Sequence, residues 1–188
     1  MSDVLLASDP LFSISDSDAS EAGSREQFLR FNLATNTTAL LSIIQLTEVL
    51  KIPIEQIVPI PHMPAWVMGI YNWRGEILWM VDLGHLIGQA PWHQATTNAS
   101  THTAMVIQSQ SGESSTQPHM LGLIVNRVED IEWCDPDLIQ SPPAVAVATE
   151  LAPFLRGYWV KTNGEMLSVL DGPAIIDRMP KPNTMADF

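Results

Sequence analysis

The chain has 188 residues, of which 46% are hydrophobic and 16% are charged, and its formal net charge is -12. This length and apolar content allow one globular domain or two small lobes, and they exclude a largely disordered chain. The excess of acidic residues makes nucleic acid a poor partner, because binding to phosphates depends mainly on Lys and Arg.

Residues 1–24 are predicted to form a disordered acidic tail. The segment contains acidic residues but no Lys or Arg, and such a composition cannot bury enough apolar surface to order itself. Leu11 and Phe12 leave open a second interpretation, a docking peptide. Neither a signal peptide nor a run of roughly 20 apolar residues is recognisable, so we expect a cytoplasmic protein without direct membrane insertion.

The first ordered region reads as short strands separated by turns. Residues 27–33 alternate between apolar and polar side chains, as a half-buried strand does, and residues 35–38 are expected to form a hairpin turn. The apolar run 39–50 fits either a helix or a strand, and we prefer a strand that bends near Gln45. Prolines restrict residues 52–61 to an edge strand or an extended loop.

The pattern on which the fold prediction depends is a central hairpin. Two runs rich in β-branched and aromatic residues, 66–71 and 77–81, are separated by the polar break 72–76, which is typical of two strands joined by a tight turn. Gly75 can take a positive φ angle there, so Arg74 would lie at the tip. Both runs are apolar along most of their length, and we therefore expect both faces of the hairpin to be covered.

The remaining elements continue the β-rich pattern. Residues 83–88 predict one helical turn closed by glycine, and the polar loop 89–101 is expected to separate two lobes. Asp171 begins a predicted helix of one or two turns, and residues 179–188 are expected to be frayed. We predict further strands over the following segments: 104–107, 120–125, 128–133, 154–160 and 165–170.

Short strands at this spacing, with Gly and Pro turns between them, favour an all-β barrel or sandwich. The stretch 67–83 has a weak echo in residues 154–171, which suggests two similar lobes. We predict a first lobe over about 34–88 and a second over about 104–165, with terminal segments completing both. The whole domain would cover residues 25–178.

No motif for catalysis, a metal or a cofactor is recognisable. The single cysteine, Cys134, excludes an internal disulfide, and its acidic neighbours should raise its pKa. The five histidines lack the spacing of a zinc site, and there is no nucleophile elbow, phosphate-binding glycine loop or dinucleotide fingerprint. We expect a protein that is not an enzyme and needs no cofactor. Trp73 and Arg74, by contrast, are residue types that dominate protein interfaces.

Several segments together resemble the CheW family, the coupling proteins of bacterial chemotaxis. Residues 28–31 and 46–49 contribute to the resemblance, the segment 64–83 is specific, and residues 122–131 in the second half match more loosely. The resemblance implies two small five-stranded SH3-like β-barrel lobes that share an apolar seam, with short helical turns. It also implies a scaffold that bridges the cytoplasmic tip of a methyl-accepting chemoreceptor and the regulatory domain of a CheA-type histidine kinase.

The resemblance also implies where partners bind. The asparagine and arginine of the turn are hallmark positions of the family, and the segment after Gln45, together with one glycine of the hairpin, lies by its receptor groove. The candidate partner-binding residues are therefore Leu46, Glu48, Val49, Gly69, Asn72, Trp73, Arg74 and Gly75.

Some features depart from the family pattern and leave alternatives open. Trp73 stands where an aliphatic residue is usual, and Asn126 stands where an aspartate is usual, which suggests a divergent member, such as one in a pilus or surface-motility system. Arg74 could pair with an acid such as Glu48, or it could reach a carboxylate of a partner. The alternative function is a β-barrel enzyme or small-molecule-binding protein that uses the cleft between the lobes.

Overall fold

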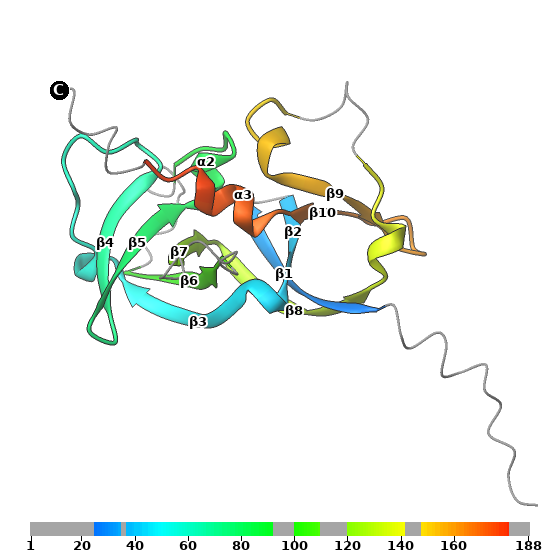
Figure 1. Ribbon diagram of the computed structural model, residues 1–188, viewed down its shortest axis with the longest axis horizontal. Helices are drawn as coiled ribbons and strands as arrows, with labels where there is room; N and C mark the ends of the chain where they lie inside the picture. The colour runs from blue at the N-terminus through cyan, green and yellow to red at the C-terminus, as the bar shows by residue number, and fades with distance from the viewer. Residues whose placement is uncertain (1–24, 35–36, 92–99, 110–119, 142–147, 181–188) are drawn as a thin grey trace, which may run out of the picture.

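Two five-stranded sheets form an all-β molecule, as the sequence predicts, with two short α-helices beside them (Figure 1). The computed structural model describes residues 25–34, 37–91, 100–109, 120–141 and 148–180. The predicted acidic tail, the residues after 180 and much of the polar loop 89–101 lie outside these residues.

The first sheet, called lobe A here, is made of strands from both halves of the chain. Its strands are β1 (Glu26–Ala34), β2 (Thr37–Ser42), β8 (Arg127–Cys134), β9 (Leu155–Val160) and β10 (Met166–Leu170). They are arranged in the order β8-β1-β2-β10-β9. Two 3-10 turns, η4 (Pro136–Leu138) and η5 (Ala152–Phe154), and the helix α3 (Gly172–Asp177) complete the lobe.

The second sheet, called lobe B, is made of one continuous part of the chain. Its strands are β3 (Leu46–Pro53), β4 (Val67–Trp73), β5 (Glu76–Asp82), β6 (Thr101–Gln108) and β7 (Met120–Val125), in the order β3-β6-β7-β5-β4. The 3-10 turns η1 (Ile43–Gln45) and η2 (Ile54–Gln56) flank β3, and the helix α2 (Leu83–Leu86) follows β5.

The apolar run 39–50 is a bent strand, which confirms the preferred interpretation and not the helical one. β2 ends at Ser42, η1 turns the chain, and β3 starts at Leu46. The bend carries the chain from the sheet of lobe A into the sheet of lobe B, so one apolar run serves both lobes.

The division of the chain between the lobes differs from the predicted one. Strands β6 and β7 were expected in a second lobe over 104–165, but they pair with β3 and β5 in lobe B. The polar loop 89–101 therefore connects elements of one lobe, and its prediction as a lobe boundary was wrong. Polar composition marks a loop, whereas sheet membership depends on pairing between strands far apart in the sequence.

The two lobes repeat one arrangement in circularly permuted order. In each lobe a parallel pair, β2 with β10 or β7 with β5, lies beside antiparallel neighbours. In each lobe one hairpin, β4–β5 or β9–β10, ends beside an aspartate that caps a short helix: Asp82 accepts a 3.1 Å hydrogen bond from His85 N, and Asp171 accepts one of 3.1 Å from Ala174 N. The weak echo between 67–83 and 154–171 is therefore a structural repeat.

Isolated bridges close each sheet into a small barrel. Val58, which follows β3 at one edge of lobe B, bridges to Ile70 of β4 at the other edge. In lobe A, Gln140 follows β8 and bridges to Tyr158 of β9 in the same way.

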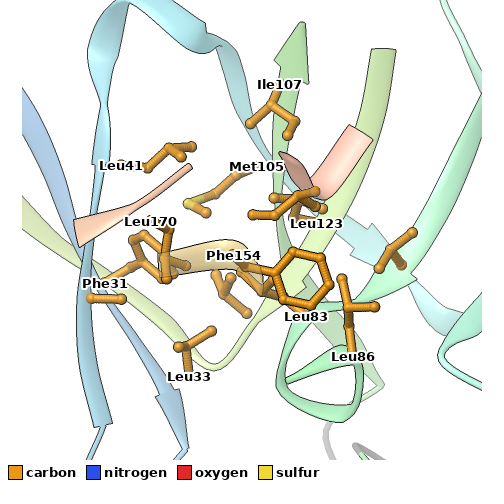
Figure 2. Packing of buried hydrophobic residues seen from close by; sticks show 14 of the residues in the cluster. Phe31, Leu33, Leu41, Leu83, Leu86, Met105, Ile107, Leu123, Phe154 and Leu170 are labelled. Carbon is orange, nitrogen blue, oxygen red and sulfur yellow. The ribbon is translucent and has the colours of Figure 1, made fainter. Parts of the chain in front are cut away.

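An apolar seam joins the two lobes, as expected (Figure 2). Phe31 and Leu41 of lobe A and Leu83, Met105 and Leu123 of lobe B have no exposed surface and belong to one cluster. Each such side chain stabilises the fold by about 1.5–3 kcal/mol through the loss of apolar surface to water. The seam is therefore the largest apolar core of the molecule, and it fixes the lobes against each other.

The central hairpin is less covered than predicted. β4 is an edge strand of lobe B, and the side chain of Ile77 in β5 is 72% exposed, whereas Leu78 and Met80 are buried. The hairpin projects past the rest of the sheet (Figure 1), so only its base is enclosed on both faces.

Gly69→Ala should strongly destabilise the fold. Gly69 has φ +142, and a Cβ there would overlap the carbonyl oxygen of Val58, whose backbone closes the barrel. Backbone strain and overpacking together predict a loss of roughly 2–5 kcal/mol in the free energy of unfolding. The control is Gly164→Ala, where φ is +84 but the space is open, with an expected cost of about 1–2 kcal/mol. Urea denaturation should separate the two; equal losses would contradict the overlap.

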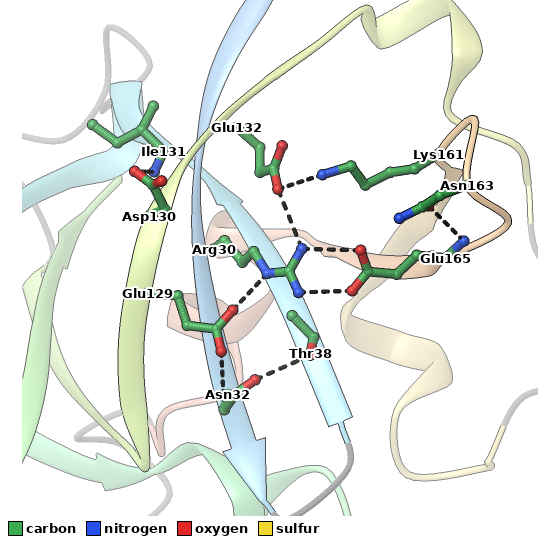
Figure 3. A network of polar contacts seen from close by, with 10 residues as sticks. All are labelled: Arg30, Asn32, Thr38, Glu129, Asp130, Ile131, Glu132, Lys161, Asn163 and Glu165. Atoms are coloured by element: carbon green, nitrogen blue, oxygen red, sulfur yellow. Dashed lines mark hydrogen bonds and ion pairs between the residues drawn. The ribbon is translucent and has the colours of Figure 1, made fainter.

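A network of charges ties the strands of lobe A together (Figure 3). Arg30 of β1 pairs with Glu129 at 2.6 Å, Glu132 at 3.2 Å and Glu165 at 2.7 Å. Lys161 also reaches Glu132, at 2.7 Å. Hydrogen bonds from Arg30 lower the pKa values of Glu129 and Glu165 below the ordinary 4.5, so the folded state favours their ionised forms.

Arg30→Met should flatten the dependence of stability on acid pH. Carboxyl groups whose pKa is lowered by folding contribute stability above their unfolded pKa, and this contribution is lost as the pH falls through their folded pKa. The wild type should therefore lose stability below about pH 4.5 more steeply than Arg30→Met does. Urea titrations at several pH values measure this, with exposed Arg156→Met as control. Parallel pH profiles for wild type and Arg30→Met would refute the assignment.

Candidate partner-binding site

The tip of the central hairpin is a rigid two-residue turn. Trp73 pairs with Glu76, and the residues between them, Arg74 and Gly75, have φ +54 and φ +89. Two positive φ angles in a two-residue loop are typical of a type I′ hairpin turn, whose twist matches that of the strands. The sequence indicated this conformation for Gly75, but not for Arg74. Asn72 secures the turn, because its Oδ1 accepts a 3.0 Å hydrogen bond from Gly75 N.

Glu48, on the edge strand β3, makes hydrogen bonds to the tip of the hairpin. Its Oε2 accepts a 3.1 Å hydrogen bond from Trp73 Nε1 and a 2.8 Å hydrogen bond from Arg74 Nη2. The guanidinium carbon of Arg74 also lies 5.0 Å from the centre of the Trp73 ring. Of the two alternatives for Arg74, the pair with Glu48 is present, while 68% of the Arg74 side chain remains exposed.

The other candidate residues lie at different depths. On β3, Val49 is 40% exposed, whereas Leu46 is half-buried against the seam. Gly69 is buried beneath Val58, so it can serve the site only by shaping β4. The structure thus brings Glu48 and the turn together and separates Gly69 from the surface.

One exposed apolar residue beside the tip was missed. Ile77 pairs with Asn72 across the hairpin and is 72% exposed. The sequence signal that could have found it is the alternation Ile77–Leu78–Trp79–Met80, in which Leu78 and Met80 point inward. This alternation was overlooked because the run is apolar throughout.

Other chemistry is sparse among the described residues. They contain no group of three or more His, Cys, Asp or Glu that could hold a metal ion, and none of their helices is long and apolar enough to cross a membrane. Cys134 is fully buried, and burial, aided by Asp135, raises the pKa of its thiol to about 11. The raised pKa agrees with the structural role expected from its acidic neighbours.

The fold and the tip define a class: a β protein of two small barrels, whose candidate site is a surface for contact with another protein. A model of the CheW-like domain family matches residues 27–179. The chain therefore belongs to the CheW-like domain family.

Named relatives agree with this assignment. The chain is 31% identical over 113 residues to the chemotaxis protein CheW of Rhizobium meliloti (strain 1021), and 30% identical over 97 residues to a probable chemotaxis protein CheW of Rhizobium etli (strain ATCC 51251 / DSM 11541 / JCM 21823 / NBRC 15573 / CFN 42). The matches cover 60% and 52% of this chain, and 64% and 55% of the relatives' lengths.

A solved structure shares the architecture. It is the crystal structure of the scaffolding protein TtCheW from Thermoanaerobacter tengcongensis, at a TM-score of 0.61 and 25% sequence identity. The superposition covers 78% of this chain and 88% of that one. The predicted fold of two SH3-like lobes is confirmed by this similarity and by the two closed sheets.

Asn72→Ala should loosen the tip without unfolding the protein. The change removes the acceptor for Gly75 N, at an expected cost of about 0.5–1.5 kcal/mol, so the Gly75 amide should exchange its hydrogen faster. The control is Asn163→Ala, which removes a 3.0 Å hydrogen bond that Asn163 Oδ1 accepts from Glu165 N in the other hairpin and should leave the exchange at Gly75 unchanged. Amide exchange measured by NMR tests this; unchanged exchange at Gly75 would show that the turn does not need Asn72.

Proposed function

We propose that this protein is a non-catalytic scaffold that couples a methyl-accepting chemoreceptor to a CheA-type histidine kinase, in chemotaxis or in surface motility. The receptor's cytoplasmic tip and the kinase's regulatory domain would be its partners. It would act in the cytoplasm, recruited to receptor arrays at the membrane. Membership of the CheW-like domain family and the chemotaxis names of its relatives support this function.

The observation that carries the proposal is the preformed hairpin tip. Glu48 holds both Trp73 and Arg74, and Asn72 holds the turn. A surface that is already ordered loses little conformational entropy when a partner binds. The hairpin also exposes one charged side chain, Arg74, and one apolar side chain, Ile77, and interfaces use residues of both kinds.

The packing of the seam weighs against the alternative, an enzyme or ligand-binding barrel that uses the cleft between the lobes. Ligand sites are concave and hold a few convergent polar groups. The seam is instead filled by apolar side chains from both lobes, such as Phe31, Leu83 and Met105 (Figure 2). Rigid docking of two barrels is what a scaffold needs, because it fixes the distance between the surfaces that partners contact.

The coupling function predicts direct binding that depends on the tip. Purified full-length protein should bind a receptor-tip fragment and a kinase regulatory domain, as measured by isothermal titration. Arg74→Ala should weaken binding of at least one partner about ten-fold, since charge-assisted contacts contribute roughly 1.5–3 kcal/mol. Arg156→Ala removes an exposed arginine of lobe A and should leave both affinities unchanged.

Two results would count against this account. If the wild type binds neither partner, the coupling function is wrong. If it binds both partners and Arg74→Ala binds them equally well, the tip is not a partner-binding site, and the contact lies elsewhere on the lobes.

A further inference from the structure

The Glu48 carboxylate is held by two donors of different kinds. Oε2 accepts from the neutral indole N–H of Trp73 at 3.1 Å and from the charged guanidinium of Arg74 at 2.8 Å. Trp73 is half-buried, and its ring packs against the interior apolar cluster of lobe B. The indole is therefore fixed by the core, whereas the Arg74 side chain is 68% exposed.

We propose that Trp73 is a positioning residue whose indole N–H fixes Glu48, so that Arg74 presents its remaining donors to a carboxylate of the partner. This inference rests on the proposed coupling function and deepens it, because it assigns an acidic side chain to the partner surface that meets the tip.

The N–H donors of Arg74 that do not bond to Glu48 support the assignment of an acidic side chain to the partner. A guanidinium carries five N–H donors in a planar fork, and among the described residues Arg74 donates only from Nη2, to Glu48. The other donors lie on an exposed side chain, and a planar fork of this kind matches a carboxylate in bidentate geometry. Arg74 therefore keeps its anchor to Glu48 while it binds a second acid.

The equivalent hairpin of lobe A shows what the indole replaces. There Glu132 Oε1 accepts from two cations, Lys161 Nζ at 2.7 Å and Arg30 Nη1 at 3.2 Å. Lys161 lies 5.7 Å from the centre of the Trp159 ring, and its side chain is only 26% exposed. Because Glu132 accepts from Arg30 as well, Lys161 is held in a closed network of charges. A neutral indole N–H holds Glu48 without adding charge, so Arg74 stays at the surface.

The distribution of charge leaves lobe B two exposed cations that a partner acid could meet, and Arg74 is the one at the hairpin tip. From β3 to the end of β7 the sequence contains only two basic residues, Lys51 and Arg74. Lys51 donates to Thr103 on the neighbouring strand. In a chain of net charge -12, an exposed arginine favours a partner that presents an acid to it.

A double-mutant cycle in the full-length protein tests whether Trp73 acts through Glu48. Trp73→Phe keeps an aromatic ring but removes the N–H, and should weaken binding of the kinase regulatory domain or the receptor tip about three- to ten-fold. In the Glu48→Ala background the same change should cost less than about two-fold, because the indole N–H then has no acceptor on residue 48. An equal cost in both backgrounds would overturn the inference.

Two further readouts separate positioning from a general loss of stability. In NMR spectra, Glu48→Gln should shift the indole N–H signal of Trp73 and leave the other tryptophans in place. Trp73→Phe should also lower the heteronuclear NOE of Arg74 Nε. An unchanged Arg74 signal would overturn the positioning role, even if the wild type bound no partner and the coupling function failed.

The acidic partner group has its own test. Wild-type affinity should fall more steeply with salt than that of Arg74→Gln, because an ion pair with the partner is screened. Identical salt slopes would show that the free donors of Arg74 meet no carboxylate.

Discussion

The apolar seam between the lobes is the constraint on which the rest of the structure depends. Lobe A is assembled from two distant parts of the chain, β1–β2 and β8–β10, and these parts meet only after the chain has passed through lobe B. Each lobe is a small barrel, and domains of that size bury too little surface to be strongly stable alone. The cluster that contains Phe31 and Met105 gives both lobes one core. The geometry of every surface feature therefore depends on this packing.

The repeat between the lobes shows how one topology can carry two different surfaces. In both lobes a carboxylate on an edge strand, Glu48 of β3 or Glu132 of β8, receives a cation from a hairpin, β4–β5 or β9–β10. In lobe A that cation, Lys161, is drawn into the network of Arg30 and is largely covered. In lobe B the indole of Trp73 takes the second donor position and the cation stays exposed. A neutral donor in place of a charged one therefore leaves the cation of lobe B at the surface.

Local signals in the sequence were sufficient for most elements. The bend near Gln45, the hairpin turn at Gly75, the one-turn helix α2 and the short helix after Asp171 all follow from residue-level rules, and the structure contains each of them. These features depend on a few neighbouring residues, so an apolar run, a glycine or an aspartate is enough to predict them.

The structural features that were not predicted from the sequence depend on contacts between residues that lie far apart in the chain. The membership of β6 and β7 in lobe B is decided by pairing with β3 and β5, and no local pattern encodes it. The positive φ of Arg74 is imposed by the twist of two strands joined through only two residues. The contact of Trp73 with Glu48 likewise needs barrel closure, which the family resemblance implied but the residues alone did not.

Exposed apolar side chains recur at equivalent places in the two hairpins, and this recurrence bears on function. Ile77 and Met166 each lie five residues before the aspartate that caps the following helix, and they are 72% and 61% exposed. Single exposed apolar residues are ordinary on protein surfaces. Two exposed apolar residues at matching positions of a diverged repeat are harder to ascribe to chance. An apolar side chain exposed to water adds no stability to its strand. The proposed coupling of two partners needs two contact surfaces, and the repeat exposes one apolar side chain on the hairpin of each lobe.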